Sequence, residues 1–174
     1  NVSHFLTHRF DRNGNNKIHT QTLAAMSPGS DSYEDLFATI RKLNLPYEDL
    51  RQQYLRMVFN VISRNVDDHS KNFSFCMDPA GVWSLSPAYD LTFSVDLSAP
   101  SYVNRHSLSL NGKTEDILYA DLEKIAQTND IHDYKSIIHG VKESISEFNK
   151  LAADLDINKN LIQRIDKEFN FLMD

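Results

Sequence analysis

The sequence predicts an α+β fold in which helices predominate, and three observations lead to this class. The chain has 174 residues, of which 41% are hydrophobic and 24% are charged, as expected of one soluble globular domain with a sizeable core. Over much of the chain, apolar residues recur every three or four positions, the spacing of one helix face. Short strand-like runs between turn-forming residues occur only in the first two thirds. A few short strands should therefore accompany a helical body.

The first elements are expected to be a strand, a turn and a helix. Residues 2–10 alternate well enough for a strand, and residues 11–17 are rich in turn-forming Asn and Gly. After a loop at residues 27–30, Ser32 has the side chain and the position to cap a helix that runs through Leu43.

A second, longer helix is predicted from Pro46 to about Ser63. Proline suits the first turn of a helix, because the N–H that it lacks has no partner there. The apolar positions that follow have nearly helical period, so one stripe should face the core. They are Leu50, Tyr54, Met57, Val58, Val61 and Ile62.

A β-hairpin is expected after a polar loop in the middle of the chain. Residues 73–77 read as its first strand, residues 78–81 as the turn and residues 82–85 as the second strand. Residues 87–105 are loop-like, with two prolines and many serines. Residues 106–110 could form one more strand.

The rest of the chain is predicted to be helical. Two strong apolar stripes of helical period cover residues 134–152 and residues 161–172. Both are interpreted as faces that pack into the core.

Charge and cysteine content narrow the classes of function. The net charge is −6 with acids and bases interspersed, which argues against direct binding of nucleic acid. The single cysteine, Cys76, excludes an internal disulfide and a zinc site built from several thiolates. No apolar run approaches the roughly 18 residues that a membrane span needs. We expect a cytoplasmic protein without membrane contact.

Three polar residues around the hairpin have the spacing of a phosphoryl-transfer site. Asn72 follows Asp67 by five positions, and Asp90 comes directly after the hairpin. In such sites one carboxylate orients the attacking hydroxyl and accepts its proton, while an amide oxygen and a second carboxylate bind Mg²⁺. An isolated D-x-x-x-x-N is usually a plain loop. Here antiparallel strands should bring Asp90 back beside Asn72, as in protein-kinase-like catalytic loops.

Four blocks of the sequence support this interpretation. They are RFDR at residues 9–12, DDHSKNFS at 67–74, WSLSPAYDL at 83–91 and HSLSLNG at 106–112. Together they resemble the HipA family of serine/threonine toxin kinases, over nearly all of the chain. The two central blocks at this spacing are a strong signal, whereas RFDR alone is a weak one.

The resemblance implies a role for each matching residue. Asp67 would be the proton acceptor, and Asn72 and Asp90 would be the Mg²⁺ ligands. Asp68 has no assigned role and is expected to face water or to cap a backbone amide. The residues that would contact ATP are His8, Arg9, Phe10 and Asp11 in the hinge and His69, Ser70, Lys71 and Tyr89 near the phosphates.

The resemblance also implies how the chain is organised. It would be the C-terminal lobe of a kinase, with a β-hairpin carrying the catalytic and metal loops. Residues 1–20 would hold the hinge strand and the turn after it, and residues 21–174 the helical lobe. The catalytic loop would be residues 65–75, and the metal-binding segment residues 87–105. The N-terminal lobe is expected to be absent from this chain, which shows no Gly-rich phosphate loop.

The leading hypothesis is therefore ATP-dependent phosphorylation of serine or threonine on a protein substrate, with Mg²⁺, by the toxin of a toxin–antitoxin pair. Its partner would be an antitoxin-like repressor that binds DNA. Two alternatives stay open. One is a non-catalytic lobe that binds the antitoxin, and the other is a small-molecule or lipid kinase.

Overall fold

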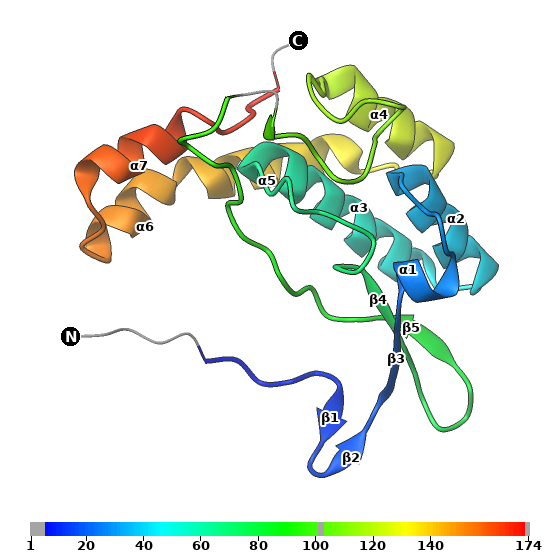
Figure 1. The fold of residues 1–174 in the computed structure, drawn as a ribbon. Helices are drawn as coiled ribbons and strands as arrows, with labels where there is room; N and C mark the ends of the chain where they lie inside the picture. Colours follow the sequence, from blue (N-terminus) through cyan, green and yellow to red (C-terminus); the bar gives the residue numbers. More distant parts are fainter. Residues whose placement is uncertain (1–5, 101–102, 173–174) are drawn as a thin grey trace.

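The computed structural model describes residues 6–100 and 103–172, and it shows a mixed fold of helices and two small sheets (Figure 1). The mixture of a helical body with a few short strands confirms the class expected from the sequence. In chain order the elements are β1 (Arg12–Asn13), β2 (Asn16–Lys17), β3 (His19–Thr22), α1 (Leu23–Met26), α2 (Tyr33–Lys42), α3 (Tyr47–Ser63), β4 (Ser74–Met77), β5 (Trp83–Leu85), α4 (Tyr119–Thr128), α5 (Tyr134–Ser146), α6 (Phe148–Asp154) and α7 (Lys159–Asp166).

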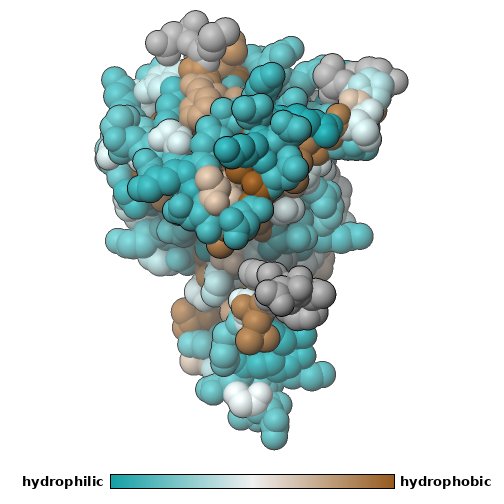
Figure 2. All heavy atoms as spheres, turned by 90° about the vertical axis from the view of Figure 1, so that its left-hand side faces the viewer, coloured by the Kyte–Doolittle hydropathy of each residue, from teal (hydrophilic) through white to brown (hydrophobic). Residues whose placement is uncertain are grey.

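The strands lie together below the helical body in the view of Figure 1. One antiparallel sheet has the order β3-β4-β5, and β1 and β2 form a separate hairpin. Helix α3 packs most extensively against α5 and also contacts α2. From the side, the molecule has a broad upper part and a narrow lower part, and apolar residues on this face form separate patches (Figure 2). No helix in the described ranges is long and apolar enough to cross a membrane.

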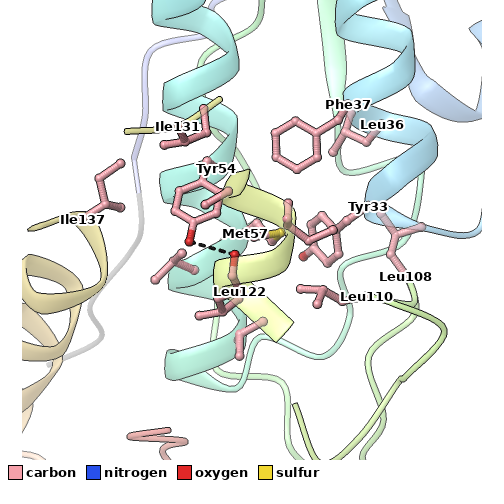
Figure 3. Packing of buried hydrophobic residues seen from close by; sticks show 14 of the residues in the cluster. Tyr33, Leu36, Phe37, Tyr54, Met57, Leu108, Leu110, Leu122, Ile131 and Ile137 are labelled. Carbon is pink, nitrogen blue, oxygen red and sulfur yellow. Dashed lines mark hydrogen bonds between the residues drawn. The ribbon is translucent and has the colours of Figure 1, made fainter. Parts of the chain in front are cut away.

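The hydrophobic core lies where α2, α3 and α4 meet (Figure 3). The Tyr54 hydroxyl in α3 donates to the carbonyl oxygen of Leu122 in α4 at 3.1 Å, so this polar atom has a partner inside the core. The largest fully buried side chains of this cluster include Tyr33, Leu36, Phe37, Tyr54, Met57, Leu108, Leu110 and Leu122.

Both helices predicted in the first half of the chain are present. The Ser32 hydroxyl oxygen caps α2 by accepting the N–H of Asp35. Helix α3 starts after Pro46, which stands at the N-cap rather than within the first turn. It ends at Ser63, and the C-cap residue Arg64 has a left-handed φ of 58°. These boundaries depend on residues at the helix ends themselves, and for that reason the sequence predicts them.

The predicted hairpin is also present, as β4 and β5. Phe75 pairs with Leu85, and the ladder continues to the turn. There the Asp78 carboxylate accepts two backbone N–H groups, and Gly81 has a φ of 85°, which favours glycine.

The strand predicted over residues 2–10 is wrong where the structure describes it. Residues 1–5 lie outside the described residues, and residues 6–10 form no strand, because no described strand pairs with them. Pairing begins in the predicted turn instead, where β1 and β2 flank Gly14. Strand β3 lacks the apolar alternation of a half-buried strand, since HTQT is polar throughout, and its pairing with β4 holds it in place.

The strand predicted over residues 106–110 is wrong as well. Only isolated bridges form there, from Ser109 to Ser32 and from Leu110 to Lys113. Side chains at residues 106–110 do alternate between buried and less buried. This alternation comes from packing into the core and not from pairing with a described strand.

The two C-terminal stripes are helical over shorter lengths than predicted. The first is divided between α5 and α6. The second passes the end of α7, and Phe169 lies in irregular chain. The Phe169 ring packs at 5.1 Å on that of Phe148 and at 6.3 Å on that of Phe93. The C-terminal segment thus supports the chain just after Asp90.

Candidate active site

A cavity of about 980 Å³ lies between the N-terminal segment and the segment that follows β5. Its volume is at the upper end of what small-molecule sites have, roughly 300–1,000 Å³. Six of the predicted site residues meet here, although the two segments are far apart in the sequence. The lining consists of Thr7, His8, Arg9, Phe10, Asp11, Thr20, Pro87, Ala88, Tyr89, Asp90, Leu91 and Thr92.

An aromatic pair joins the two walls of the cavity. The rings of Phe10 and Tyr89 lie 5.6 Å apart between centroids, tilted by 30°. The Tyr89 hydroxyl donates to the carbonyl oxygen of Lys71 at 2.6 Å and also contacts the Ser74 hydroxyl. Burial raises the pKa of Tyr89, so its hydroxyl stays protonated at neutral pH. These contacts fix one aromatic face of the cavity.

Asp11 lies in the same wall with its charge already compensated. Arg9 and Arg12 each place a guanidinium nitrogen 2.6 Å from its carboxylate. The hydrogen bond from Arg9, with the charge of Arg12 nearby, lowers the pKa of Asp11 to about 2. The carboxylate is therefore ionised at any physiological pH without adding net negative charge to the cavity.

The two predicted metal ligands line one small cavity beside the larger one. Asn72 and Asp90 meet there with the polar residues Asn65 and Asp68. The Asn72 amide nitrogen donates to the Asp67 carbonyl oxygen at 2.9 Å, which leaves its amide oxygen for another partner. Asp90 is exposed, with a left-handed φ of 56°.

This pair fits a magnesium ion. Mg²⁺ is bound through one or two carboxylates together with water and phosphate oxygens, and both available groups are oxygen donors. No cluster of three or more His, Cys, Asp or Glu side chains within residues 6–100 and 103–172 could hold a metal alone. Any ion here would depend on Asn72, Asp90 and its remaining ligands from solvent or substrate.

Asp67 stands apart from these contacts. Its side chain is 58% exposed, and His69 Nε2 lies 3.8 Å from Asp67 Oδ1. Its backbone N–H donates to the Ser94 hydroxyl at 3.0 Å. The predicted proton acceptor is thus an accessible carboxylate that only its backbone holds in place.

Three predicted ATP contacts do not line the large cavity. The Lys71 side chain is exposed, and Ser70 is held through its carbonyl oxygen, which accepts the N–H of Ala24 at 3.1 Å. The buried Nδ1 of His69 has no hydrogen-bond partner among the described residues. Their roles in nucleotide binding stay predictions.

The neighbouring carboxylate, Asp68, is buried and structural. One oxygen accepts the Tyr33 hydroxyl at 2.6 Å and lies 2.8 Å from His106 Nδ1. The other accepts the N–H groups of Ser107 at 2.7 Å and Leu108 at 3.4 Å. Its side chain is 0% exposed, so the expectation that it faces water is wrong and the backbone-cap interpretation is correct. Asp68 ties the loop to α2 and to residues 106–108.

The site contains polar residues that the sequence interpretation missed. Arg56 donates to the Ser86 carbonyl oxygen at 2.8 Å, and Asn60 accepts from Asn65 at 3.0 Å. Both residues lie within the apolar stripe of α3, four positions apart and almost fully buried. Polar side chains inside such a stripe are the signal that could have found them. Nothing in the sequence indicates Ser94.

Replacing Asp68 by alanine should lower the free energy of unfolding by about 3–5 kcal/mol, because buried donors would lose their acceptor. Urea unfolding followed by circular dichroism measures this. The adjacent Asp67→Ala is the matched control and should change stability by less than about 0.5 kcal/mol, since its side chain is exposed. Equal stabilities for the two variants would show that the buried network contributes nothing.

A family model described as HipA-like C-terminal domain matches residues 1–155. The curated protein "Putative kinase Y4mE" of Sinorhizobium fredii (strain NBRC 101917 / NGR234) is 33% identical over 70 residues, which are 40% of this chain and 16% of that protein.

A solved relative shares the fold. It belongs to the complex of HipA, HipB and operator DNA from the toxin–antitoxin system of Shewanella oneidensis MR-1. The match has a TM-score of 0.63 at 19% identity and covers 91% of this chain and 44% of that one. The chain thus spans less than half the length of either relative.

Proposed function

The chain belongs to the family of HipA-like C-terminal domains, and from this membership we propose that it is the catalytic lobe of an ATP-dependent serine/threonine protein kinase. One observation carries the proposal. The N-terminal segment and the segment after β5 line one open cavity, and Asn72 and Asp90 both line a small cavity beside it. A nucleotide in the cavity would therefore have oxygen ligands for a metal at its edge.

Each residue has a distinct task in this proposal. Phe10 and Tyr89 offer aromatic surface to the nucleotide in the cavity. Asn72 and Asp90 would hold Mg²⁺, which would supply positive charge to neutralise the nucleotide phosphates. Asp67 orients the serine or threonine hydroxyl and accepts its proton, for which an exposed carboxylate is suited.

The remaining parts of the active enzyme would come from outside this chain. Because the chain matches 44% of the solved HipA-complex chain, we propose that another lobe closes over the cavity and completes the phosphate contacts. That complex includes HipB and operator DNA, and we propose an antitoxin-type repressor as the partner of this protein too. The whole protein would then be the toxin of such a pair.

The direct test incubates the complete protein with γ-labelled ATP, Mg²⁺ and a lysate of its host. Label should appear on serine or threonine of a protein retained on a filter. Label in the soluble or organic fraction instead would indicate a small-molecule or lipid kinase. Binding of the antitoxin without any transfer of label would indicate a non-catalytic lobe.

A change in the aromatic pair tests where ATP binds. Phe10→Ala should weaken ATP binding by about tenfold, since stacking of an aromatic side chain on a base contributes roughly 1–3 kcal/mol. Calorimetric titration of the complete protein measures the affinity. Phe171→Ala is the control, because this partly exposed phenylalanine lies outside the cavity. Equal ATP affinities for the two variants would place the nucleotide elsewhere.

A further inference from the structure

One serine hydroxyl connects the two functional segments of the proposed site. Ser94 lies four residues after Asp90, and its oxygen accepts the N–H of Val66 at 2.8 Å and that of Asp67 at 3.0 Å. Both donors belong to the loop that carries the predicted proton acceptor. The segment after β5 therefore holds the backbone of this loop directly.

A buried amide completes the connection. Asn65 is 2% exposed, and its oxygen accepts the Ser94 hydroxyl at 3.3 Å. Its amide nitrogen donates to Asn60 in α3 at 3.0 Å and to the carbonyl oxygen of Asp90 at 3.4 Å. Asn65 and Ser94 together thus join α3, the catalytic loop and the backbone of Asp90. We call these two side chains the Asn65–Ser94 link.

The exposure of Asp67 gives this link its importance. The Asp67 carboxylate is 58% exposed, and among the described residues its one ionisable neighbour within 4 Å is His69 at 3.8 Å, so its own contacts do not fix its position. The Asp90 side chain is exposed too, on a residue with left-handed backbone. Where a proposed base and a proposed metal ligand both have exposed carboxylates, the hydrogen bonds of their backbones must set the distance between them.

We propose that Asn65 and Ser94 are positioning residues that fix the position of Asp67 relative to Asp90. The inference rests on the proposed function for its effect on rate, but the link itself is a property of the folded chain. Loss of the Ser94 hydroxyl leaves the N–H groups of Val66 and Asp67 without their acceptor. The loop then relaxes toward water, and Asp67 moves relative to Asp90.

The experiment compares Ser94→Ala with Ser98→Ala in the complete protein. Ser98 is a suitable control because it lies in the same segment and, among the described residues, its hydroxyl bonds only to the nearby Asp96. Steady-state kinetics should show kcat reduced by tenfold or more in Ser94→Ala, with KM for ATP within about twofold, because ATP contacts are not changed. Amide hydrogen exchange should become faster at Val66 and Asp67.

The two readouts separate the possible failures. Unchanged exchange at Val66 and Asp67 in Ser94→Ala would overturn the link, whatever the activity. Faster exchange with a kcat equal to that of Ser98→Ala would overturn its positioning role. If the unmodified protein transfers no phosphate, the proposed function fails, and the exchange rates still decide whether the link exists.

Discussion

Replacement of Asp67 by asparagine should reduce phosphate transfer by about a hundredfold or more, while ATP affinity changes by less than about tenfold. A positioned general base typically contributes on the order of 10²–10⁴ to a rate, and asparagine keeps the shape without the charge. Nucleotide binding should be little affected, since Asp67 does not line the large cavity and the metal is assigned to Asn72 and Asp90. A filter assay for labelled protein and a nucleotide titration on the complete protein measure the two quantities.

Asp31→Asn is the control for this change, because it removes another exposed carboxylate away from the site. If the protein inhibits growth, Asp67→Asn should abolish inhibition as well. Inhibition that persisted without transfer would indicate toxicity by binding. Phosphate transfer at the original rate would show that a residue other than Asp67 is the general base. The buried Asp68 could not take this role without unfolding of the loop.

The sequence predicts those parts of the fold whose causes are local. Helix α2 begins where Ser32 caps it, and the hairpin turn has its own Asp78 contacts, so neighbouring residues suffice to indicate both. Strand β3 and residues 106–110 cannot be predicted from local sequence in this way. Their structure depends on partners distant in the sequence, and neither polarity nor alternation reveals whether such a partner exists.

Within the candidate site, too, the sequence predicts features with local causes but not those that depend on tertiary contacts. The spacing of Asp67, Asn72 and Asp90 is visible in the sequence, and the hairpin explains why the last two meet. The difference between Asp67 and Asp68 is invisible there, since two adjacent carboxylates look alike until tertiary packing buries one of them. Ser94 is likewise indistinguishable in a serine-rich segment until the fold places its hydroxyl against the backbone of Asp67.

The second large effect is expected for Asp90→Asn, which should slow phosphate transfer by about a hundredfold or more and raise the Mg²⁺ concentration that gives half the maximal rate. Metal ions stabilise transition-state charge by several kcal/mol, and each 1.36 kcal/mol lost is a tenfold change in rate. Asparagine is the right replacement, because it tolerates the left-handed backbone of this residue, with its φ of 56°. Transfer rates over a series of Mg²⁺ concentrations measure both effects.

Asp116→Asn provides a matched control for this variant. Asp116 is also exposed and left-handed, with a φ of 50°, and it lies outside both cavities of the candidate site. It therefore reports what the same chemical change costs in the same backbone conformation without a metal. If Asp90→Asn kept its rate and its Mg²⁺ dependence within a few-fold of Asp116→Asn, Asp90 would not be a metal ligand. A rate loss that more Mg²⁺ partly restores would assign the carboxylate to the ion rather than to the fold of the loop.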